Sequence, residues 1–436
     1  MSRLPAVLLL AASLLFLFAP GCAPTEPEPE PAPQKDAEAP PSPAPPEGEA
    51  SAPVDPDAAA KVAESVNAFG LAVYGRVRGE EGNLFLSPYS IASALAMTWA
   101  GARGETATEM AETLRLPAAW RGEPERIHGA FGQLTAALND PDAAYDLSVA
   151  NALWGQEGYG FRDAFLGLLK THYGAGLREV DFHDATDEAR QTINAWVEEK
   201  TEEKITDLIP EGMLVPQTRL VLTNAIYFLG TWEYPFDEER TKEEDFFAPS
   251  GTVQVPLMRQ TEHYRYADAG GHHVVGLPYK GEDLAMVLLV PKKKDGLGAL
   301  EEALSAEALA GWIDAMQRRE VRVLLPRFKV TWRAMMKKVL SGMGMAQAFD
   351  PEKADFNGMN GGTEPLWIGQ VVHKAFVEVD EEGTEAAAAT GVGMVGTALP
   401  PEPPPVVRCD RPFVFLVRDT RSGAILFLGR LVNPAE

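Results

Sequence analysis

The sequence has too few cysteines and too few basic residues for several common classes of protein. Its 436 residues include two cysteines, Cys22 and Cys409, which excludes a disulfide framework and a cysteine-based zinc site. Lysine and arginine number 39 against 63 acidic residues, so the formal net charge is −24. This charge argues against nucleic acid, heparin and anionic membrane surfaces as partners, because each of them attracts a basic surface.

The sequence also lacks a membrane-spanning run and a standard catalytic motif. The longest apolar run, residues 4–19, is shorter than the roughly 20 residues that a transmembrane helix needs. There is no GxSxG elbow, HExxH helix, Walker loop or CxxC pair. The neighbours His272 and His273 would point to opposite faces of a strand, so they make a poor ligand pair. We therefore expect no metal, no cofactor and no enzyme activity.

The N-terminal region carries a targeting pattern. Arg3 precedes the apolar run, and small residues and a proline then lead to Cys22, as in a secretory signal. Residues 19–22 resemble a bacterial lipobox, in which the cysteine is lipidated and becomes the new N-terminus. The resemblance implies a lipoprotein-type signal peptide over residues 1–21 and a secreted protein anchored at the cell envelope, at the outer membrane, the cell surface or in the periplasm. The N-terminal lipid would be its only contact with a membrane.

Residues 22–57 have the composition of a tether. Proline, glutamate and alanine dominate this segment and aromatic residues are absent, so it cannot bury enough apolar surface to fold. Frequent prolines and repelling acids favour an extended chain that holds the next domain away from the membrane. A cleaved or functionless tail is the alternative interpretation.

Residues 58–436 are predicted to form one domain, because no second linker and no internal repeat interrupts them. Ser87 and Pro88 have the residue types of a helix N-cap and first helical position. Helices cluster early and strands cluster late, which predicts an α+β fold with large, mainly antiparallel sheets and about eight or nine helices. Helical periodicity is found near residues 62–73, 92–99, 105–115, 123–138, 161–172, 187–203 and 301–317, and strand patterns near 83–86, 146–154, 219–228, 284–290, 320–326, 367–379, 413–418 and 424–431.

A long segment without a clear element of its own follows the strand at 367–379. Loops longer than about 15 residues are uncommon in compact domains and are usually functional. Alternate positions from 384 to 390 carry only threonine and alanine, so this face could enter a crowded sheet interior as a strand. Gly383 adds a position with few backbone restrictions. Because alanine also favours helix, a short surface helix followed by a linker is the alternative.

Four segments in order resemble the signatures of the serpins, and together they span nearly all of residues 58–434. They are residues 83–110, 224–237, 371–390 and 410–434. The resemblance implies a serpin-like fold with an exposed reactive loop at about 381–408. It also implies a serine protease, or in some members a cysteine protease, as the partner. In such proteins the protease cleaves the loop and forms an acyl-enzyme. The loop hinge then inserts into the main sheet and traps the protease.

The same resemblance assigns the hinge and the reactive bond. Small side chains on the inward hinge face match the inhibitory pattern, so we expect an inhibitor. The family's usual loop length places the reactive bond at Thr397–Ala398. The segment up to Pro412 is longer than usual, which leaves Met394–Val395 and Ala398–Leu399 as alternatives. The hinge residues are Glu381, Gly383, Thr384, Glu385, Ala386, Ala387, Ala388, Ala389 and Thr390.

The residue types of the loop indicate the class of protease. A small residue before the reactive bond suits elastase-like or subtilisin-like proteases. No arginine or lysine occurs between residues 383 and 407, so trypsin-like targets are not expected. Two other functions remain open at this point: a non-inhibitory serpin that serves as a scaffold or binding protein, and a hydrolase with a distributed catalytic triad.

The resemblance further implies a cluster that controls opening of the main sheet. Its members would be Ser87, Ser90, Asn224 and His373, with Trp232 at the point where insertion begins. On general grounds, a lone histidine on an apolar strand face is a hydrogen-bonded core residue, and a tryptophan in such a place packs in the core. The helix near 123–138 offers few basic residues, so heparin-type activation is not expected, and we expect a monomer.

Overall fold

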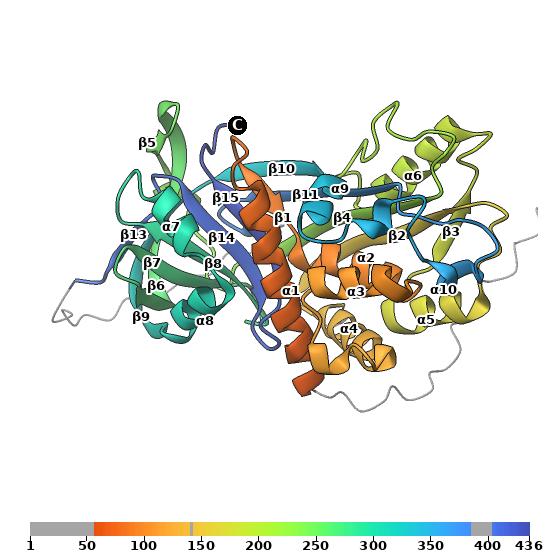
Figure 1. Ribbon diagram of the computed structural model, residues 1–436. Coiled ribbons are helices and arrows are strands. Elements are labelled where there is room, and N and C mark those ends of the chain that lie inside the picture. The colour runs from red at the N-terminus through yellow and green to blue at the C-terminus, as the bar shows by residue number, and fades with distance from the viewer. Residues whose placement is uncertain (1–55, 140–142, 385–402) are drawn as a thin grey trace, which may run out of the picture. The chain divides into compact units, whose positions relative to one another are not determined.

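The computed structural model describes residues 56–139, 143–384 and 403–436 (Figure 1). These residues confirm the α+β class, with helices packed around two sheets. No helix in these ranges is both long and apolar enough to cross a membrane. The α-helices are α1 (Pro56–Val77), α2 (Pro88–Trp99), α3 (Gly104–Thr113), α4 (Pro124–Leu138), α5 (Asp163–Tyr173), α6 (Thr186–Lys200), α7 (Leu297–Ala303), α8 (Ala306–Asp314), α9 (Met336–Gly342) and α10 (Asn357–Asn360).

One sheet has nine strands and is antiparallel except where β13 joins β9. Strand β5 lies off the main strand order and pairs with β6. The order is β1 (Leu84–Leu86), β15 (Ile425–Leu431), β14 (Phe413–Asp419), β8 (Leu284–Pro291), β7 (His272–Pro278), β6 (Gly251–Asp268), β9 (Gln317–Pro326) and β13 (Val406–Arg408), with β5 (Lys242–Ala248) beside β6.

The other sheet has six strands and is mixed. Its long strands β2, β4, β11 and β10 lie side by side, and β12 is a pair of residues between β11 and β4. Pairing is parallel between β11 and β4 and between β2 and β3, and antiparallel elsewhere. The order is β10 (Phe328–Met335), β11 (Gln370–Val379), β12 (Gly383–Thr384), β4 (Leu220–Thr231), β2 (Tyr145–Gln156) and β3 (Leu177–Val180).

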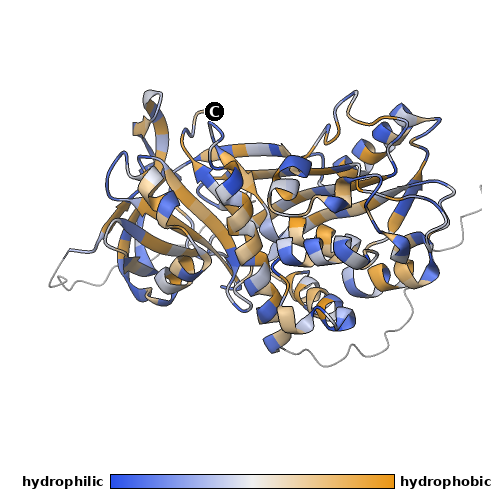
Figure 2. Ribbon diagram, in the orientation of Figure 1, coloured by the Kyte–Doolittle hydropathy of each residue, from blue (hydrophilic) through white to orange (hydrophobic). Residues whose placement is uncertain are grey.

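The apolar residues form two cores on the two faces of the six-stranded sheet. The larger core joins its inner face to α1–α5 and to the nine-stranded sheet. A smaller core lies between its outer face and the region of α6. Hydrophobic residues follow the strands of both sheets, whereas the connecting loops are largely hydrophilic (Figure 2). Both faces of β4 and β11 are therefore buried, and any strand that joins them must fit between two cores.

Helix α2 begins where the sequence predicts it. The Oγ atom of Ser87 accepts a hydrogen bond from the backbone N–H of Ser90 at 3.1 Å, and Pro88 occupies the first helical position. Every residue of α2 is buried. The cap therefore fixes two polar side chains inside the molecule, against the inner face of the six-stranded sheet.

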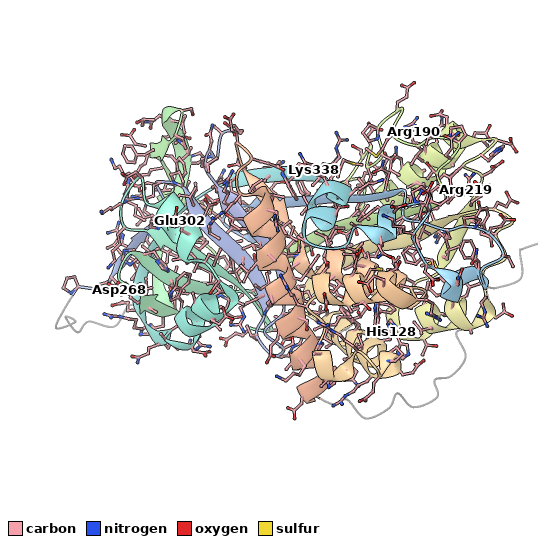
Figure 3. All side chains as sticks on the ribbon, in the orientation of Figure 1. His128, Arg190, Arg219, Asp268, Glu302 and Lys338 are labelled. Atoms are coloured by element: carbon pink, nitrogen blue, oxygen red, sulfur yellow. The ribbon has the colours of Figure 1, made fainter. Side chains whose placement is uncertain are left out.

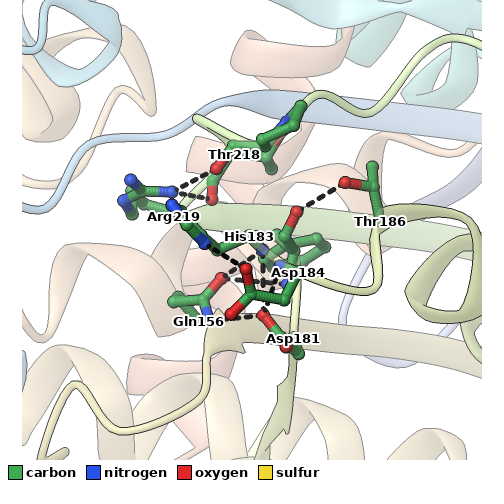
Figure 4. Close-up of polar contacts among 9 residues, drawn as sticks. Gln156, Asp181, His183, Asp184, Thr186, Thr218 and Arg219 are labelled. Carbon is green, nitrogen blue, oxygen red and sulfur yellow. Dashed lines mark hydrogen bonds and ion pairs between the residues drawn. The ribbon is translucent and has the colours of Figure 1, made fainter.

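The segment that leads into α6 is tied to the end of β2 (Figure 4). The Oδ1 atom of Asp181 accepts hydrogen bonds from the backbone N–H groups of His183 and Asp184 and from the Gln156 side chain, at 2.9, 3.0 and 3.1 Å. These bonds hold the pKa of Asp181 below its ordinary value, led by the bond from Asp184. The start of α6 is thus anchored beside the sheet whose outer face it covers.

Candidate functional site

Strands β4 and β11 are neighbours over only part of their length. They pair from Gln370 opposite Val221 to Ala375 opposite Ile226. Past this point β12 lies between them and pairs antiparallel with both. Thr384 is opposite Val379 of β11 and opposite Gly230 of β4. The chain after β11 therefore turns back and begins an additional strand in the middle of the sheet.

The turn before β12 is built by Asp380. Its Oδ1 atom accepts hydrogen bonds from the backbone N–H groups of Glu382 and Gly383, at 3.0 and 3.1 Å. Burial raises the pKa of this carboxyl group. A Cβ atom on Gly383 would lie 2.0 Å from the carbonyl oxygen of Gly230. Gly383 is therefore required because its backbone packs closely against β4. The sequence alone suggests a different reason, namely that glycine has few backbone restrictions.

Thr384 fills a buried position next to two aromatic rings. Its Oγ1 atom lies 2.7 Å from the hydroxyl group of Tyr279. The ring of Tyr279 stacks on that of Trp232, with 4.6 Å between centroids and 14° between planes. The Nε1–H group of Trp232 donates to the carbonyl oxygen of Asp380 at 3.0 Å. Trp232 thus lies beside the turn that leads into β12.

Glu381 fastens the turn to two other segments. Its buried carboxylate accepts a hydrogen bond from Arg327 Nε at 2.6 Å and another from the hydroxyl group of Thr241. The bond to Glu381 raises the pKa of Arg327. The carbonyl oxygen of Glu381 also accepts from the backbone N–H of Phe236 at 2.7 Å. This hinge residue therefore anchors the turn, while Gly383 and Thr384 occupy the sheet.

A buried polar cluster joins β11 to β4 below the end of β12. The Nε2 atom of His373 accepts from the backbone N–H of Ser87 at 3.2 Å, and its Nδ1 atom bonds to Oδ1 of Asn224. The amide of Asn224 donates to Ser90 Oγ and to Asn151 Oδ1. The structure thus brings together the four predicted residues and adds Asn151. His373 and Asn224 are also opposite each other in the strand register.

Burial keeps two histidines neutral in the folded protein. It lowers the pKa of His373 to about 3. Burial, followed by repulsion from His172, also lowers the pKa of His128 to about 3. His128 lies on α4 (Figure 3), and its Nδ1 atom is 2.8 Å from the hydroxyl group of Tyr173. Neither side chain can accept a proton near neutral pH without losing its place in the core.

We expect the free energy of unfolding to fall as the pH is lowered from about 7 to about 5. The unfolded chain protonates these histidines below their ordinary pKa of 6.5, whereas the folded chain does so only near 3. The two histidines therefore cost no stability above pH 6.5. As the pH falls from 6.5 towards 3, the unfolded chain takes up protons that the folded chain does not, and the free energy of unfolding decreases. Each histidine accounts for roughly 2 kcal/mol at pH 5. Urea unfolding at several pH values measures the loss, and His128→Phe should remove about half of it. An unchanged pH dependence in this variant would contradict the assignment.

Several predicted site residues lie outside the described residues. They are Cys22, the hinge residues Glu385, Ala386, Ala387, Ala388, Ala389 and Thr390, and the reactive-bond residues Thr397 and Ala398. Cys409 is described and is fully buried, and burial raises the pKa of its thiol. Among the described residues, no group of three or more potential ligands could hold a metal ion.

Sequence reasoning missed four residues that build the site. Tyr279 and Asn151 contact Thr384 and Asn224, and Arg327 and Thr241 hold Glu381. Tyr279 follows the end of β7 and Thr241 precedes β5, and no local pattern distinguishes either position. Asn151 was visible as an amide within an apolar strand, a placement that usually requires a buried hydrogen-bond partner.

A comparison with protein families gives this site its context. The family model of the serpins, described as serine protease inhibitors, matches residues 64–434. The chain belongs to the serpin family. Among its relatives, one is named as a protease inhibitor and another for the ligand that it binds.

The relatives of this serpin include both kinds of protein. It is 40% identical to an uncharacterized serpin-like protein of Thermococcus kodakarensis, over 86% of each chain. It is also 40% identical to the leukocyte elastase inhibitor of Homo sapiens, over 81% of this chain and 93% of that protein. The crystal structure of human thyroxine-binding globulin with its ligand matches with a TM-score of 0.79 and 31% identity, over 87% of this chain and all of that chain.

Proposed function

We propose that this serpin inhibits serine proteases by suicide-substrate trapping. The reactive loop is cleaved near Thr397–Ala398, and the hinge then inserts between β4 and β11. One observation carries the proposal: β12 is already paired with both strands, at the top of the seam between them. Insertion needs only to extend this strand while β4 and β11 separate.

The register of β12 predicts where each inserted hinge residue lies. Thr384 faces the inner core, so alternation along a strand directs residues 386, 388 and 390 to the same crowded side. These positions are alanine, alanine and threonine, which fit a space between packed strands. Continuing the register opposite Val379 and Gly230 brings Thr390 opposite His373 and Asn224. Full insertion must therefore break the hydrogen bond between those two side chains.

The proposed insertion can be tested by comparing the stability of the protein before and after its loop is cleaved. An inserted strand of about ten residues gains backbone hydrogen bonds on both sides, each worth about 1 kcal/mol net. We expect cleavage within residues 385–402 to raise Tm by roughly 20 °C or more. Thermal unfolding of intact and cleaved protein measures the change. An unchanged Tm after complete cleavage would show that the hinge does not insert.

The proposed targets are elastase-like or subtilisin-like serine proteases, with cysteine proteases as a further class. The absence of basic residues from 383 to 407 and the small residue at Thr397 support this choice. The 40% identity to a protein named leukocyte elastase inhibitor points in the same direction. We propose that the protein acts as a monomer that needs no heparin-type activator.

We further propose that the protein is a bacterial lipoprotein held at the cell envelope. The support is the N-terminal sequence: an apolar run after Arg3, Cys22 in a lipobox-like setting, and a proline-rich acidic segment up to residue 57. Mass spectrometry of the membrane fraction would show diacylglycerol at Cys22. An unmodified soluble form that starts elsewhere would contradict the anchor and leave the inhibitory mechanism untouched.

A binding protein without inhibitory activity is the second candidate. The similarity to thyroxine-binding globulin favours it, because that relative is named for a ligand. The two functions differ in one readout. An inhibitor forms a covalent complex that survives denaturation, whereas a binding serpin is cleaved in its loop and releases the protease.

A further inference from the structure

Strands β6, β9 and β13 are neighbours at one edge of the nine-stranded sheet (Figure 1). Residues that are opposite each other in neighbouring strands share a face of the sheet. Val321 and Val323 of β9 are fully buried, so the alternate positions 318, 320 and 322 point to the other face. That face carries an exposed group of arginines, which we call the arginine face: Arg265 on β6, and Arg318 and Arg322 on β9.

The arginine face has no acidic partner among the described residues. Arg318 donates a hydrogen bond to the hydroxyl group of Tyr234 at 3.1 Å. Arg265 donates to the carbonyl oxygen of Met316 at 3.5 Å. The Arg322 side chain is exposed and makes no hydrogen bond or ion pair within the described ranges. The charges of all three guanidinium groups are therefore available to a partner.

The surroundings of this face keep it positive in a strongly acidic protein. Arg259 and Arg408 border the face, and both donate to the carboxylate of Glu244. Glu320 lies on the face itself, opposite His263. With the histidine neutral, five arginines and two glutamates give a local net charge of +3 in a chain whose net charge is −24. Because the Debye length is about 10 Å at 0.1 M salt, a docked acidic surface responds to this local charge more than to the whole chain.

The arginine face adjoins the end of the reactive loop. Val406 of β13 is opposite Arg322 and is 48% exposed, and the backbone N–H of Arg322 donates to the carbonyl oxygen of Pro405 at 2.9 Å. The predicted bond before Ala398 is eight residues from Val406, which is at most about 28 Å of chain. A domain of about 250 residues has a radius of gyration of roughly 18 Å and is wider than this reach. A protease held at the reactive bond can therefore contact the arginine face.

We propose that the arginine face is a docking surface for an acidic patch on the target protease. Each exposed guanidinium group can donate two parallel hydrogen bonds to a carboxylate of the partner. The face would thus select, among proteases with the same cleavage specificity, those with an acidic surface near the active site. Exposed charges at an interface act mainly on the rate of association. The proposal rests on the proposed function only in that proteases cleave the loop, and it does not require trapping.

The rate of loop cleavage in the full-length protein tests this surface. The probes are subtilisin and subtilisin with succinylated lysines, in which each modified ammonium group becomes a carboxylate; a small peptide substrate verifies that both are active. Loss of intact chain on denaturing gels gives the rate constant, whether the product is trapped or released. We expect Arg318→Glu/Arg322→Glu to lower the rate constant for the succinylated protease at least about tenfold at low salt. The loss should shrink towards 1 M salt, where the Debye length is about 3 Å, and should be smaller for unmodified subtilisin.

Two further variants separate docking from net charge and from misfolding. Lys337→Glu/Lys338→Glu makes the same change of charge on exposed residues of α9, beside the six-stranded sheet (Figure 3), and should alter the rate constant less than about twofold. Arg318→Gln/Arg322→Gln removes the charge without reversing it and should give a smaller loss in the same direction. Circular dichroism verifies that all three double variants fold.

Three outcomes distinguish the proposals. Equal loss of rate in the Arg318→Glu/Arg322→Glu and Lys337→Glu/Lys338→Glu variants would mean that net charge alone acts, and would overturn the docking surface. Heparin binding that disappears in Arg318→Glu/Arg322→Glu, with unchanged cleavage rates, would assign the face to a polyanion and overturn it as well. Complete cleavage without a covalent complex would refute the inhibitory mechanism, while the expected differences in cleavage rate would still support the docking surface.

Discussion

Replacing Thr384 with arginine should convert this serpin from an inhibitor into a substrate. The Thr384 side chain is fully buried and lies against the hydroxyl group of Tyr279. Arginine at this position would have to bury an unpaired charge or leave the sheet, at a cost of several kcal/mol. A barrier higher by about 3 kcal/mol slows insertion more than a hundredfold. The acyl-enzyme is then hydrolysed before the loop can insert, and the protease is released active.

The yield of trapped complex on denaturing gels measures this effect. We expect it to fall at least tenfold in Thr384→Arg, while loop cleavage becomes complete. Thr384→Ser is the matched control, because it keeps the hydroxyl group that faces Tyr279 and should trap normally. Circular dichroism verifies that both variants fold. If Thr384→Arg traps protease at the level of the unaltered protein, the assignment of β12 as the start of insertion is wrong.

Replacing His373 with leucine should let the sheet open too easily. The variant leaves the backbone N–H of Ser87 and the side-chain oxygen of Asn224 without the partner that His373 provides. Each buried unpaired group costs about 1–3 kcal/mol. In the proposed mechanism, full insertion separates these groups, so their loss in the variant should destabilise the loop-exposed form relative to the inserted form. We expect Tm to fall by roughly 5–15 °C.

The rate at which inhibitory activity is lost during incubation measures how fast the loop inserts spontaneously. Spontaneous insertion should proceed at least tenfold faster in His373→Leu than in the unaltered protein, because the native cluster no longer resists separation of β4 and β11. Lys374→Met is the control. Lys374 neighbours His373 on β11 but donates to the carbonyl oxygen of Thr206 on the opposite face. Equal rates in both variants would mean that the cluster has no role in sheet opening.

Much of the fold could be predicted from sequence because its signals are local. The apolar runs near 146–154, 219–228, 284–290 and 413–418 correspond to β2, β4, β8 and β14. The helix expected near 301–317 is instead two helices and the start of β9. Ser305 caps α8 through a hydrogen bond from the backbone N–H of Ala308. Helical periodicity continues across this break, so the pattern alone does not reveal it.

The strands β5, β6, β7 and β10 were not predicted, and neither were the short strands β3 and β13. β6 extends over residues 251–268 and carries many charged and polar side chains, so it lacks the simple alternation of a half-buried strand. Tertiary pairing with β5, β7 and β9 decides its conformation. β10 does carry a local signal, because buried Phe328, Val330 and Trp332 alternate with exposed residues.

Only those residues of the candidate site that belong to a family motif could be predicted from the sequence. The cluster of His373, Asn224, Ser87 and Ser90 was found through resemblance, since these residues are far apart along the chain. Tyr279 and Arg327 were missed because their role depends on where β12 turns back. Two features set the position of that turn: the space between β4 and β11 that β12 fills, and the hydrogen bonds that Asp380 accepts. Both depend on tertiary structure, so the sequence does not reveal them.

The central claim is that this serpin traps its target covalently after cleavage of the loop. Incubation with elastase, subtilisin, chymotrypsin and trypsin, followed by denaturing gels and mass spectrometry, tests it directly. We expect a denaturation-resistant complex with at least one of the first three proteases, none with trypsin, and a released C-terminal peptide that begins at Ala398. Complete cleavage of the loop by these proteases without any covalent complex would contradict the account.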